Sequence, residues 1–286
     1  MPSARDSWRP VSLGLLACLL VLRLVPEPAA LAQTQAPAPA AAAATLSDAE
    51  IERFLLEARI TRTRSVGKGV TNSIRATMTD GTITHEAHIQ VVDERKNTGP
   101  SSQGPELNFR DTWAFNIAAY KLDRLIGLNL VPVSVERRYR NKSGAFTWWI
   151  DDVMMDEGQR LEKNIQPPAP SLWNETMQLV RIFDQLIYNM DRNMGNLLIT
   201  KDWRIWAIDH TRAFRLHKQL KTPKNVTRCD RSLLEGLKRL DEPTLERELG
   251  RHLTNWEIDA VLARRDAIVE IIEAAGPAAL FERRQK

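Results

Sequence analysis

Apolar and polar residues alternate along much of the first half of the chain, which is the pattern of half-buried strands. The alternation is clear between residues 58 and 92, where the turn Thr79-Asp80-Gly81 separates two strand-like runs and predicts an antiparallel hairpin. Residues 96–105 are rich in glycine, serine and proline and predict a loop. The remaining elements expected here are one helix over residues 111–126, ending at Gly127, and a second strand pair at residues 130–139 and 145–154.

The second half of the chain has mainly the helical period. A long amphipathic helix is predicted over residues 171–189, followed by a short hairpin whose strands are residues 197–200 and 204–208. Strands followed by helices indicate an α+β protein with a cleft between two lobes. Further helices are expected near residues 230–240, 242–253 and 256–275. Residues 47–155 would form a β-rich N-lobe that contains one helix, and residues 156–286 would form a mainly helical C-lobe.

Three side chains around the second-half hairpin indicate a phosphoryl-transfer site. Asp191 and Asn196 are five positions apart after the long helix, which is the offset of the kinase catalytic loop. Asp209 follows the return strand, and because antiparallel strands bring their open ends together, Asn196 and Asp209 should lie side by side. Two metal-binding oxygens and one base would then meet at one place. The alternative is a surface hairpin capped by Asp and Asn, which are common loop residues.

The whole string N-x-D-R-x-x-x-N-L-L-I…W-x-I-D-H-x-x-A-F, from Asn189 to Phe214, resembles the atypical kinases. These include the phosphatidylinositol 3- and 4-kinase-like group, the HipA-type bacterial kinases and the secretory-pathway protein kinases. The resemblance implies a two-lobed protein-kinase-like fold that uses ATP with Mg²⁺ or Mn²⁺ and transfers phosphate to a hydroxyl acceptor. It also implies that Asp191 is the catalytic base and that Asn196 and Asp209 hold the metal.

Other residues are candidates for contact with the nucleotide. In kinases a glycine-rich turn covers the phosphates, because bare backbone can approach them closely. Gly67-Lys68-Gly69, between two predicted strands, is the candidate for this turn, although such turns are commonly only structural. The resemblance also places Met154 where a kinase hinge meets adenine, and the same residue would suit an ordinary core.

The resemblance continues through residues 118–132 and reveals a departure from the kinase pattern. Asn116 stands where related kinases have a Glu, and Gln90 stands where the Lys that pairs with this Glu is expected. Two amides can hydrogen-bond each other but supply no positive charge to phosphates. Lys68, Lys96 or the metal could supply that charge instead, or the protein could bind nucleotide and transfer nothing.

Three functions are therefore compatible with the sequence. The favoured one is an ATP-dependent phosphotransferase. The second is a pseudokinase, a nucleotide-binding or structural regulatory module, which the residues Gln90 and Asn116 support. The third is transfer of AMP in place of phosphate. The acceptor is unknown and could be a protein, a lipid headgroup or a small molecule.

The N-terminus has the features of a targeting segment. Residues 1–32 have a basic start, an apolar run and a small-residue cleavage signal, and they predict a signal peptide. A retained membrane anchor is the alternative. Residues 33–46, rich in alanine and proline, predict a linker. We expect an exported, periplasmic or secreted bacterial protein with no stable membrane insertion after cleavage.

Composition adds two limits. The formal net charge of +4 is mild, and no basic stripe interleaved with aromatic residues is present, so nucleic acid is not an expected partner. Removal of the signal peptide would leave Cys229 as the single cysteine, which excludes an internal disulfide framework. We expect Cys229 to be a small buried residue and not a nucleophile, because no histidine lies near it in sequence.

Overall fold

The computed structural model describes residues 46–66, 73–99 and 104–283. Residues from Leu46 onward form one compact unit. The predicted signal peptide, nearly all of the predicted linker and the Gly67-Lys68-Gly69 turn lie outside the described residues. Within the described part, no helix is long and apolar enough to cross a membrane.

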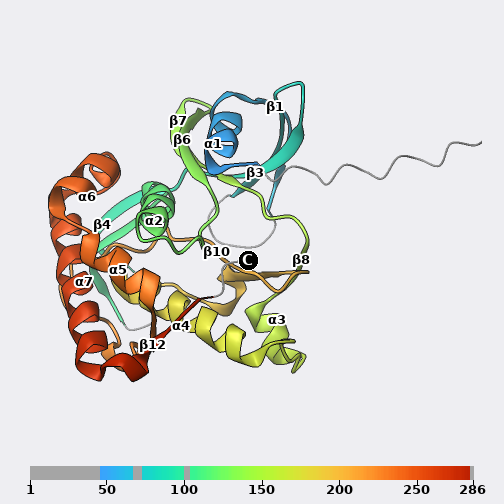
Figure 1. Ribbon diagram of the computed structural model, residues 1–286. Helices are drawn as coiled ribbons and strands as arrows, with labels where there is room; N and C mark the ends of the chain where they lie inside the picture. Colours follow the sequence, from blue (N-terminus) through green and yellow to red (C-terminus); the bar gives the residue numbers. More distant parts are fainter. Residues whose placement is uncertain (1–45, 67–72, 100–103, 284–286) are drawn as a thin grey trace, which may run out of the picture. The chain divides into compact units, whose positions relative to one another are not determined.

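The compact unit begins with a helix and a five-stranded antiparallel sheet (Figure 1). Helix α1 (Asp48–Glu57) starts with a capping box in which Ser47 and Glu50 satisfy each other's backbone N–H groups. The Thr79-Asp80-Gly81 turn closes the β2–β3 hairpin as predicted, with Thr79 paired to Thr84. The strands are β1 (Arg59–Ser65), β2 (Ile74–Thr79), β3 (Thr84–Gln90), β6 (Ser134–Tyr139) and β7 (Lys142–Trp148), in the order β1-β2-β3-β7-β6.

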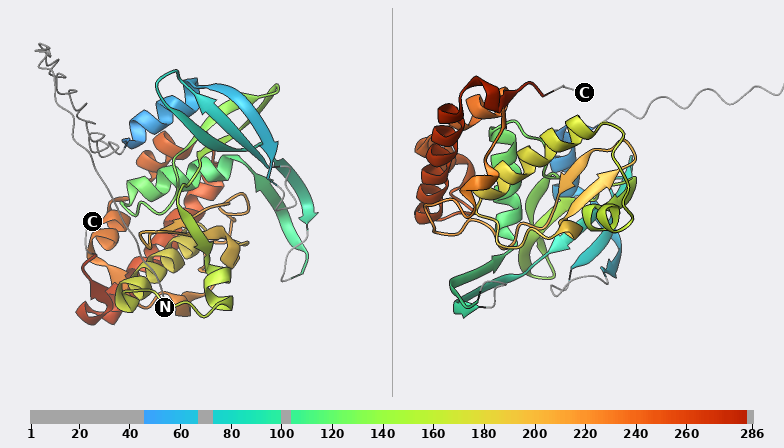
Figure 2. Two further views of the ribbon diagram at one scale, coloured as in Figure 1. Left: turned by 90° about the vertical axis from the view of Figure 1, so that its right-hand side faces the viewer. Right: turned by 90° about the horizontal axis from the view of Figure 1, so that it is seen from below.

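A second antiparallel pair, β4 (Asp93–Gly99) and β5 (Glu106–Thr112), projects away from this sheet (Figure 2). The predicted loop over residues 96–105 was therefore partly wrong. Nearly every residue of β4 is exposed, so the strand has no apolar alternation to reveal it. The predicted helix also began too early, because Asp111 and Thr112 finish β5 and α2 spans Ala114–Leu125.

The third sheet consists of β8 (Val153–Asp156), β9 (Leu197–Thr200) and β10 (Ile205–Ala207), in the order β10-β9-β8. The β9–β10 hairpin matches the prediction. The strand expected at residues 145–154 is instead two strands, because β7 ends at Trp148 and β8 leaves the first sheet to pair with β9. The strand expected from residue 130 starts only at Ser134; Leu130 accepts a hydrogen bond from Ala207 N (2.9 Å) outside the first sheet.

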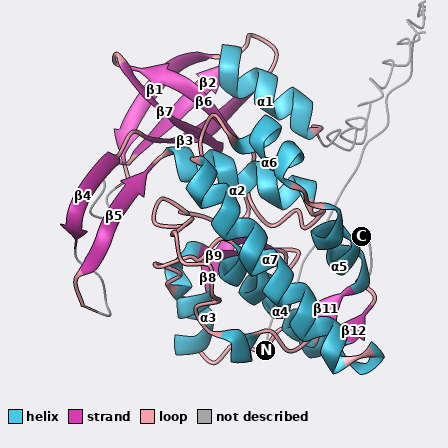
Figure 3. Ribbon diagram, turned by 90° about the vertical axis from the view of Figure 1, so that its left-hand side faces the viewer, coloured by secondary structure: helices cyan, strands magenta, loops and turns pink. Residues whose placement is uncertain are grey.

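Helices make up most of the remaining chain (Figure 3). Two-residue strands β11 (Cys229–Asp230) and β12 (Leu280–Phe281) pair in parallel. The helices are α3 (Glu157–Glu162), α4 (Pro170–Leu186), α5 (Arg231–Arg239), α6 (Glu242–Leu249) and α7 (Asn255–Ala275), so the helices predicted in this half are present. The protein is α+β, as predicted.

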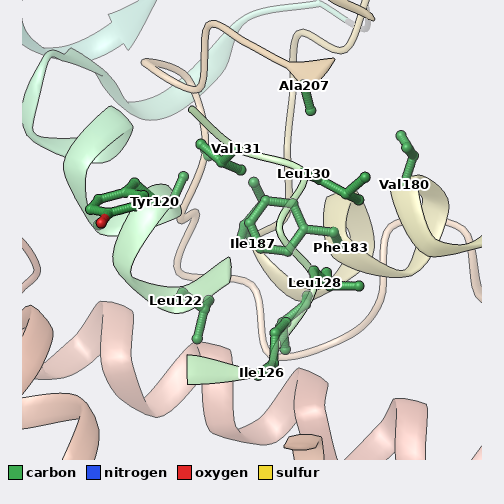
Figure 4. Close-up of a cluster of buried hydrophobic side chains, with 14 of the residues drawn as sticks. Tyr120, Leu122, Ile126, Leu128, Leu130, Val131, Val180, Phe183, Ile187 and Ala207 are labelled. Carbon is green, nitrogen blue, oxygen red and sulfur yellow. The ribbon is translucent and has the colours of Figure 1, made fainter. Parts of the chain in front are cut away.

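A buried apolar cluster joins these helices to the third sheet (Figure 4). Leu128 and Leu130, in the segment that follows α2, lie among side chains of α4 and its C-terminal end, including Phe183 and Ile187. Ala207 of β10 belongs to the same core. Cys229 is fully buried, and burial raises the pKa of its thiol to about 12, so its environment is that of an inert core residue.

Candidate active site

The segment that carries Asp191 is shaped by the end of helix α4. After Leu186 the chain turns at Tyr188, which has a left-handed φ of 46°. Asn189 is buried, and its side chain accepts one hydrogen bond and donates another. Oδ1 accepts from Asp191 N at 3.0 Å, and Nδ2 donates to Asp184 Oδ1 at 3.0 Å. The backbone of Asp191 is thereby fixed, while its carboxylate stays exposed to solvent.

Arg192 connects this loop to the rest of the site. Its guanidinium donates to both carboxylate oxygens of Asp184, with Nε at 3.0 Å from Oδ2. It also donates to the carbonyls of Asn196 (3.2 Å) and Ile208 (2.8 Å), and to His210 Nε2 (2.9 Å). Burial, together with the adjacent Arg192, lowers the pKa of His210 well below its usual value, so the ring is neutral and accepts this bond. Arg192 therefore braces the loop.

Asn196 and Asp209 lie at the open end of the β9–β10 hairpin. Ile208 N donates to the Asn196 carbonyl at 3.0 Å, so Asp209 follows directly after the residue that faces Asn196. The Asn196 side chain points back to the loop, with Nδ2 at 3.5 Å from the Asp191 carbonyl. Asp209 has a left-handed φ of 55°, a conformation that Asp tolerates better than most side chains.

Gln90 and Asn116 meet Asp209 in a chain of buried amides. Asn116 Nδ2 donates to Gln90 Oε1 at 2.6 Å, and Gln90 Nε2 lies 3.4 Å from Asp209 Oδ1. Asn116 Oδ1 accepts from the backbone N–H of His210 at 2.8 Å. Gln90 and Asn116 are 2% and 5% exposed. Gln90 and Asn116 thus form a neutral hydrogen-bonded pair, and this pair positions the Asp209 segment.

Sequence reasoning missed three residues beside Asp209. The Thr211 hydroxyl lies 3.3 Å from Asp209 Oδ1 and is also a hydrogen-bond partner of the Asp111 carboxylate. Burial raises the pKa of Asp111; the Thr211 bond opposes this shift, and the charge of Asp209 adds to it. Burial lowers the pKa of His88, and the charge of the nearby Asp209 opposes this shift. Alternation along β3 puts residues 88 and 90 on one face of the strand. This was the one feature of the sequence that could have placed His88 on the same side as Gln90.

Within the described part of the chain, the other candidates take no part in these contacts. Met154 is 39% exposed and sits at the irregular position of β8, between Val153 and Met155. Lys96 lies on the exposed strand β4, where Nζ bonds Glu94 at 2.7 Å. A different lysine is near the loop: Lys221 Nζ donates to the Asn189 carbonyl at 3.2 Å. Burial lowers the pKa of Lys221, and the carboxylates of Asp184 and Asp191 oppose this shift.

The donor set around Asp209 suits a hard divalent cation that is also held by phosphate. Asp209 and Asn196 offer oxygen ligands. Asp209 accepts hydrogen bonds from the Gln90 amide and the Thr211 hydroxyl, and Asn196 Nδ2 is turned to the Asp191 carbonyl. Within the described ranges, Asp111 Oδ1 is buried with no hydrogen-bond partner, while the charge of nearby Arg212 lowers the pKa of this carboxyl against the effect of burial. No group of three or more His, Cys, Asp and Glu side chains in those ranges could hold a metal ion unaided. Mg²⁺ commonly binds one or two carboxylates plus substrate phosphates.

The fold itself is that of the atypical kinases. A hydra Fam20 protein solved with sugar matches with a TM-score of 0.60 and 15% sequence identity, over 83% of this chain and 93% of that one. The Golgi casein kinase with Mn and ADP bound matches with a TM-score of 0.56 and 13% identity, over 82% and 78%. No family model matches the sequence. No curated protein matches it either. Identities this low establish the fold alone, and the chain has an atypical kinase-like fold.

We expect Arg192→Met to destabilise the protein by about 3–5 kcal/mol, because it leaves the Asp184 carboxylate without its buried partner. Both side chains are little exposed, at 11% and 13%. Arg231→Met is the matched control, since it breaks the exposed Arg231–Glu282 pair and should change the free energy of unfolding by at most about 1 kcal/mol. Urea unfolding of both variants measures the difference. Equal small losses would show that Arg192 does not brace the loop.

Proposed function

We propose that this protein is an ATP-dependent phosphotransferase that uses Mg²⁺ or Mn²⁺ and passes phosphate to a hydroxyl acceptor. The observation that carries the proposal is the arrangement of Asp191, Asn196 and Asp209 around one hairpin end on an atypical kinase-like fold. In phosphoryl transfer, positioning and charge stabilisation do most of the catalytic work, and these three side chains are the types that such a site requires.

Each residue has a distinct part in the proposed reaction. Asp191 is exposed and its backbone is fixed, so its carboxylate is free to accept the proton of an attacking hydroxyl. Asp209 and Asn196 hold the divalent cation, which when bound neutralises phosphate charge. Gln90 and Asn116 hold the Asp209 segment through hydrogen bonds. Arg192 keeps the two ends of the site together.

A pseudokinase is the second candidate, and the Gln90–Asn116 pair favours it. This pair is neutral and buried, so it cannot bring positive charge to the phosphates. A protein that binds nucleotide through Asp209 and transfers nothing would be compatible with the same contacts. We also propose that the protein is exported by its N-terminal segment.

Calorimetric titration of the protein with Mn²⁺-ATP tests the nucleotide site, and mass spectrometry of candidate acceptors tests the reaction. We expect nucleotide to bind and an acceptor to gain the mass of one phosphate. A gain of one AMP would instead establish nucleotidyl transfer. Binding with no product from any acceptor, including the protein itself, would support the pseudokinase. Absence of binding by the folded protein would contradict the nucleotide site.

A further inference from the structure

A groove opens beside the segment that carries Asp191. It has a volume of about 1140 Å³ and is formed by four separate parts of the chain: the β4–β5 hairpin, residues 188 and 190, residues 214–217 and the N-terminus of α7. Met190, which lines the groove, directly precedes Asp191. An acceptor held in the groove would therefore lie next to the proposed base. The volume exceeds the range of roughly 300–1,000 Å³ usual for small-molecule pockets, which favours a chain-like occupant.

Large exposed apolar side chains gather at this groove. Leu107 on β5, Leu216 after Phe214 and Trp256 in the first turn of α7 are 75%, 49% and 73% exposed, and all three line it. Exposed apolar side chains that come together mark binding surfaces, whereas single ones are ordinary. Tryptophan in particular is enriched among the residues that carry most of the binding energy at protein interfaces.

The charge of the groove is positive on the hairpin side. Its two lining carboxylates are already paired within the wall, Glu257 with Arg110 and Glu106 with Arg215. Among the described residues, no carboxylate lies within ion-pair distance of Arg95, and Lys96 has only the exposed Glu94 as its partner. A ligand with carboxylates would complement this side, while a cationic ligand would be repelled.

We propose that this groove binds the acceptor as an acidic polypeptide segment that carries a large apolar side chain near its hydroxyl residue. Trp256 and Leu107 contact the apolar side chain, and Arg95 contacts the carboxylates. This inference rests on the proposed phosphotransferase function, because it names the class of acceptor for the same site. Peptide binding and phosphate transfer are separate measurements, so one can fail without the other.

The test uses fluorescence anisotropy of the whole protein with three labelled peptides. The first contains one Ser flanked by Glu residues and one Phe; the second has Lys in place of each Glu; the third has Gly in place of Phe. We expect the first peptide to bind, with affinity that falls as salt rises. The other two should bind at least about tenfold and fivefold more weakly, because they lose the charge match and the apolar anchor.

Variants locate the binding. Trp256→Ala should weaken the first peptide at least about fivefold, and Arg95→Glu should weaken it about tenfold and reduce its salt dependence. Leu56→Ala on α1 and Arg62→Glu on β1 are matched controls, since both side chains are exposed outside the groove. Equal binding of all three peptides, no binding of any, or unchanged binding by the groove variants would overturn the proposal. Peptide binding without ATP binding would support the assignment of the groove as a peptide site and contradict the proposed phosphotransferase function.

Discussion

Asp209→Asn should abolish the stabilisation of this protein by Mn²⁺-ATP while leaving the fold intact. Asparagine tolerates the left-handed φ of 55° at this position, and its amide oxygen can still accept from Gln90 and Thr211. The variant lacks the negative charge that attracts a divalent cation. Ligand at a hundred times its Kd stabilises a folded protein by about 2.7 kcal/mol. For a domain of this size, that corresponds to an increase in Tm of about 5–10 °C in the wild type and none in the variant.

Asp202→Asn is the matched control for this experiment. Asp202 lies at the turn end of the same hairpin, where it accepts a hydrogen bond from Thr200 Oγ1 at 2.5 Å. Its replacement should leave the nucleotide response unchanged, because it is at the opposite end of the hairpin from Asn196 and Asp209. Differential scanning fluorimetry with and without Mn²⁺-ATP measures both variants. A full nucleotide response in Asp209→Asn would show that the metal site has been placed wrongly.

Asp191→Asn should separate binding from transfer. Among the described residues, the exposed carboxylate makes no hydrogen bond to another side chain, and the backbone N–H of residue 191 keeps its bond to Asn189. We therefore expect Mn²⁺-ATP to bind as in the wild type. The rate of phosphate transfer should fall about 10²–10⁴-fold, since the amide cannot accept the proton of the attacking hydroxyl.

Two measurements on the same preparation check this prediction: calorimetric Kd for Mn²⁺-ATP and the initial rate of transfer to an identified acceptor. Asp202→Asn again serves as the control, with both quantities unchanged. A rate equal to that of the wild type would remove Asp191 from the role of base. A loss of nucleotide binding together with transfer would indicate that Asp191 supports the site instead of acting on the acceptor.

Local sequence patterns were sufficient to predict the helices and strands that bury one face. The β9–β10 hairpin, helix α4 and the helices after residue 230 follow from apolar periodicity, because burial of one face dictates that periodicity. The alternation along β3 likewise placed Gln90 on the polar face, and its amide reaches Asp209. Strand β4 was not predictable in this way. Its side chains are exposed on both faces, so its sequence has no apolar alternation that would indicate a strand paired with β5.

Contacts between distant segments lay beyond sequence reasoning. The Thr211 hydroxyl is a hydrogen-bond partner of both Asp111 and Asp209, and these two carboxylates are nearly a hundred positions apart in the chain. The groove needs four segments from the hairpin to α7, none of which has a motif. Side-chain type alone could not reveal that Arg192 reaches two backbone carbonyls and two side chains at once.

The sequence by itself determined the class of fold and the chemical types at the proposed site, because the spacing of Asp191 and Asn196 and the hairpin before Asp209 are local features. It also predicted a neutral Gln90–Asn116 pair, and the two amides do hydrogen-bond each other. Only the tertiary structure decided how Gln90 and Asn116 engage Asp209, which carboxylate stands beside it, and where a groove opens next to the Asp191 segment. Those relations depend on packing between segments far apart in sequence, and residue order does not encode such packing in any short pattern.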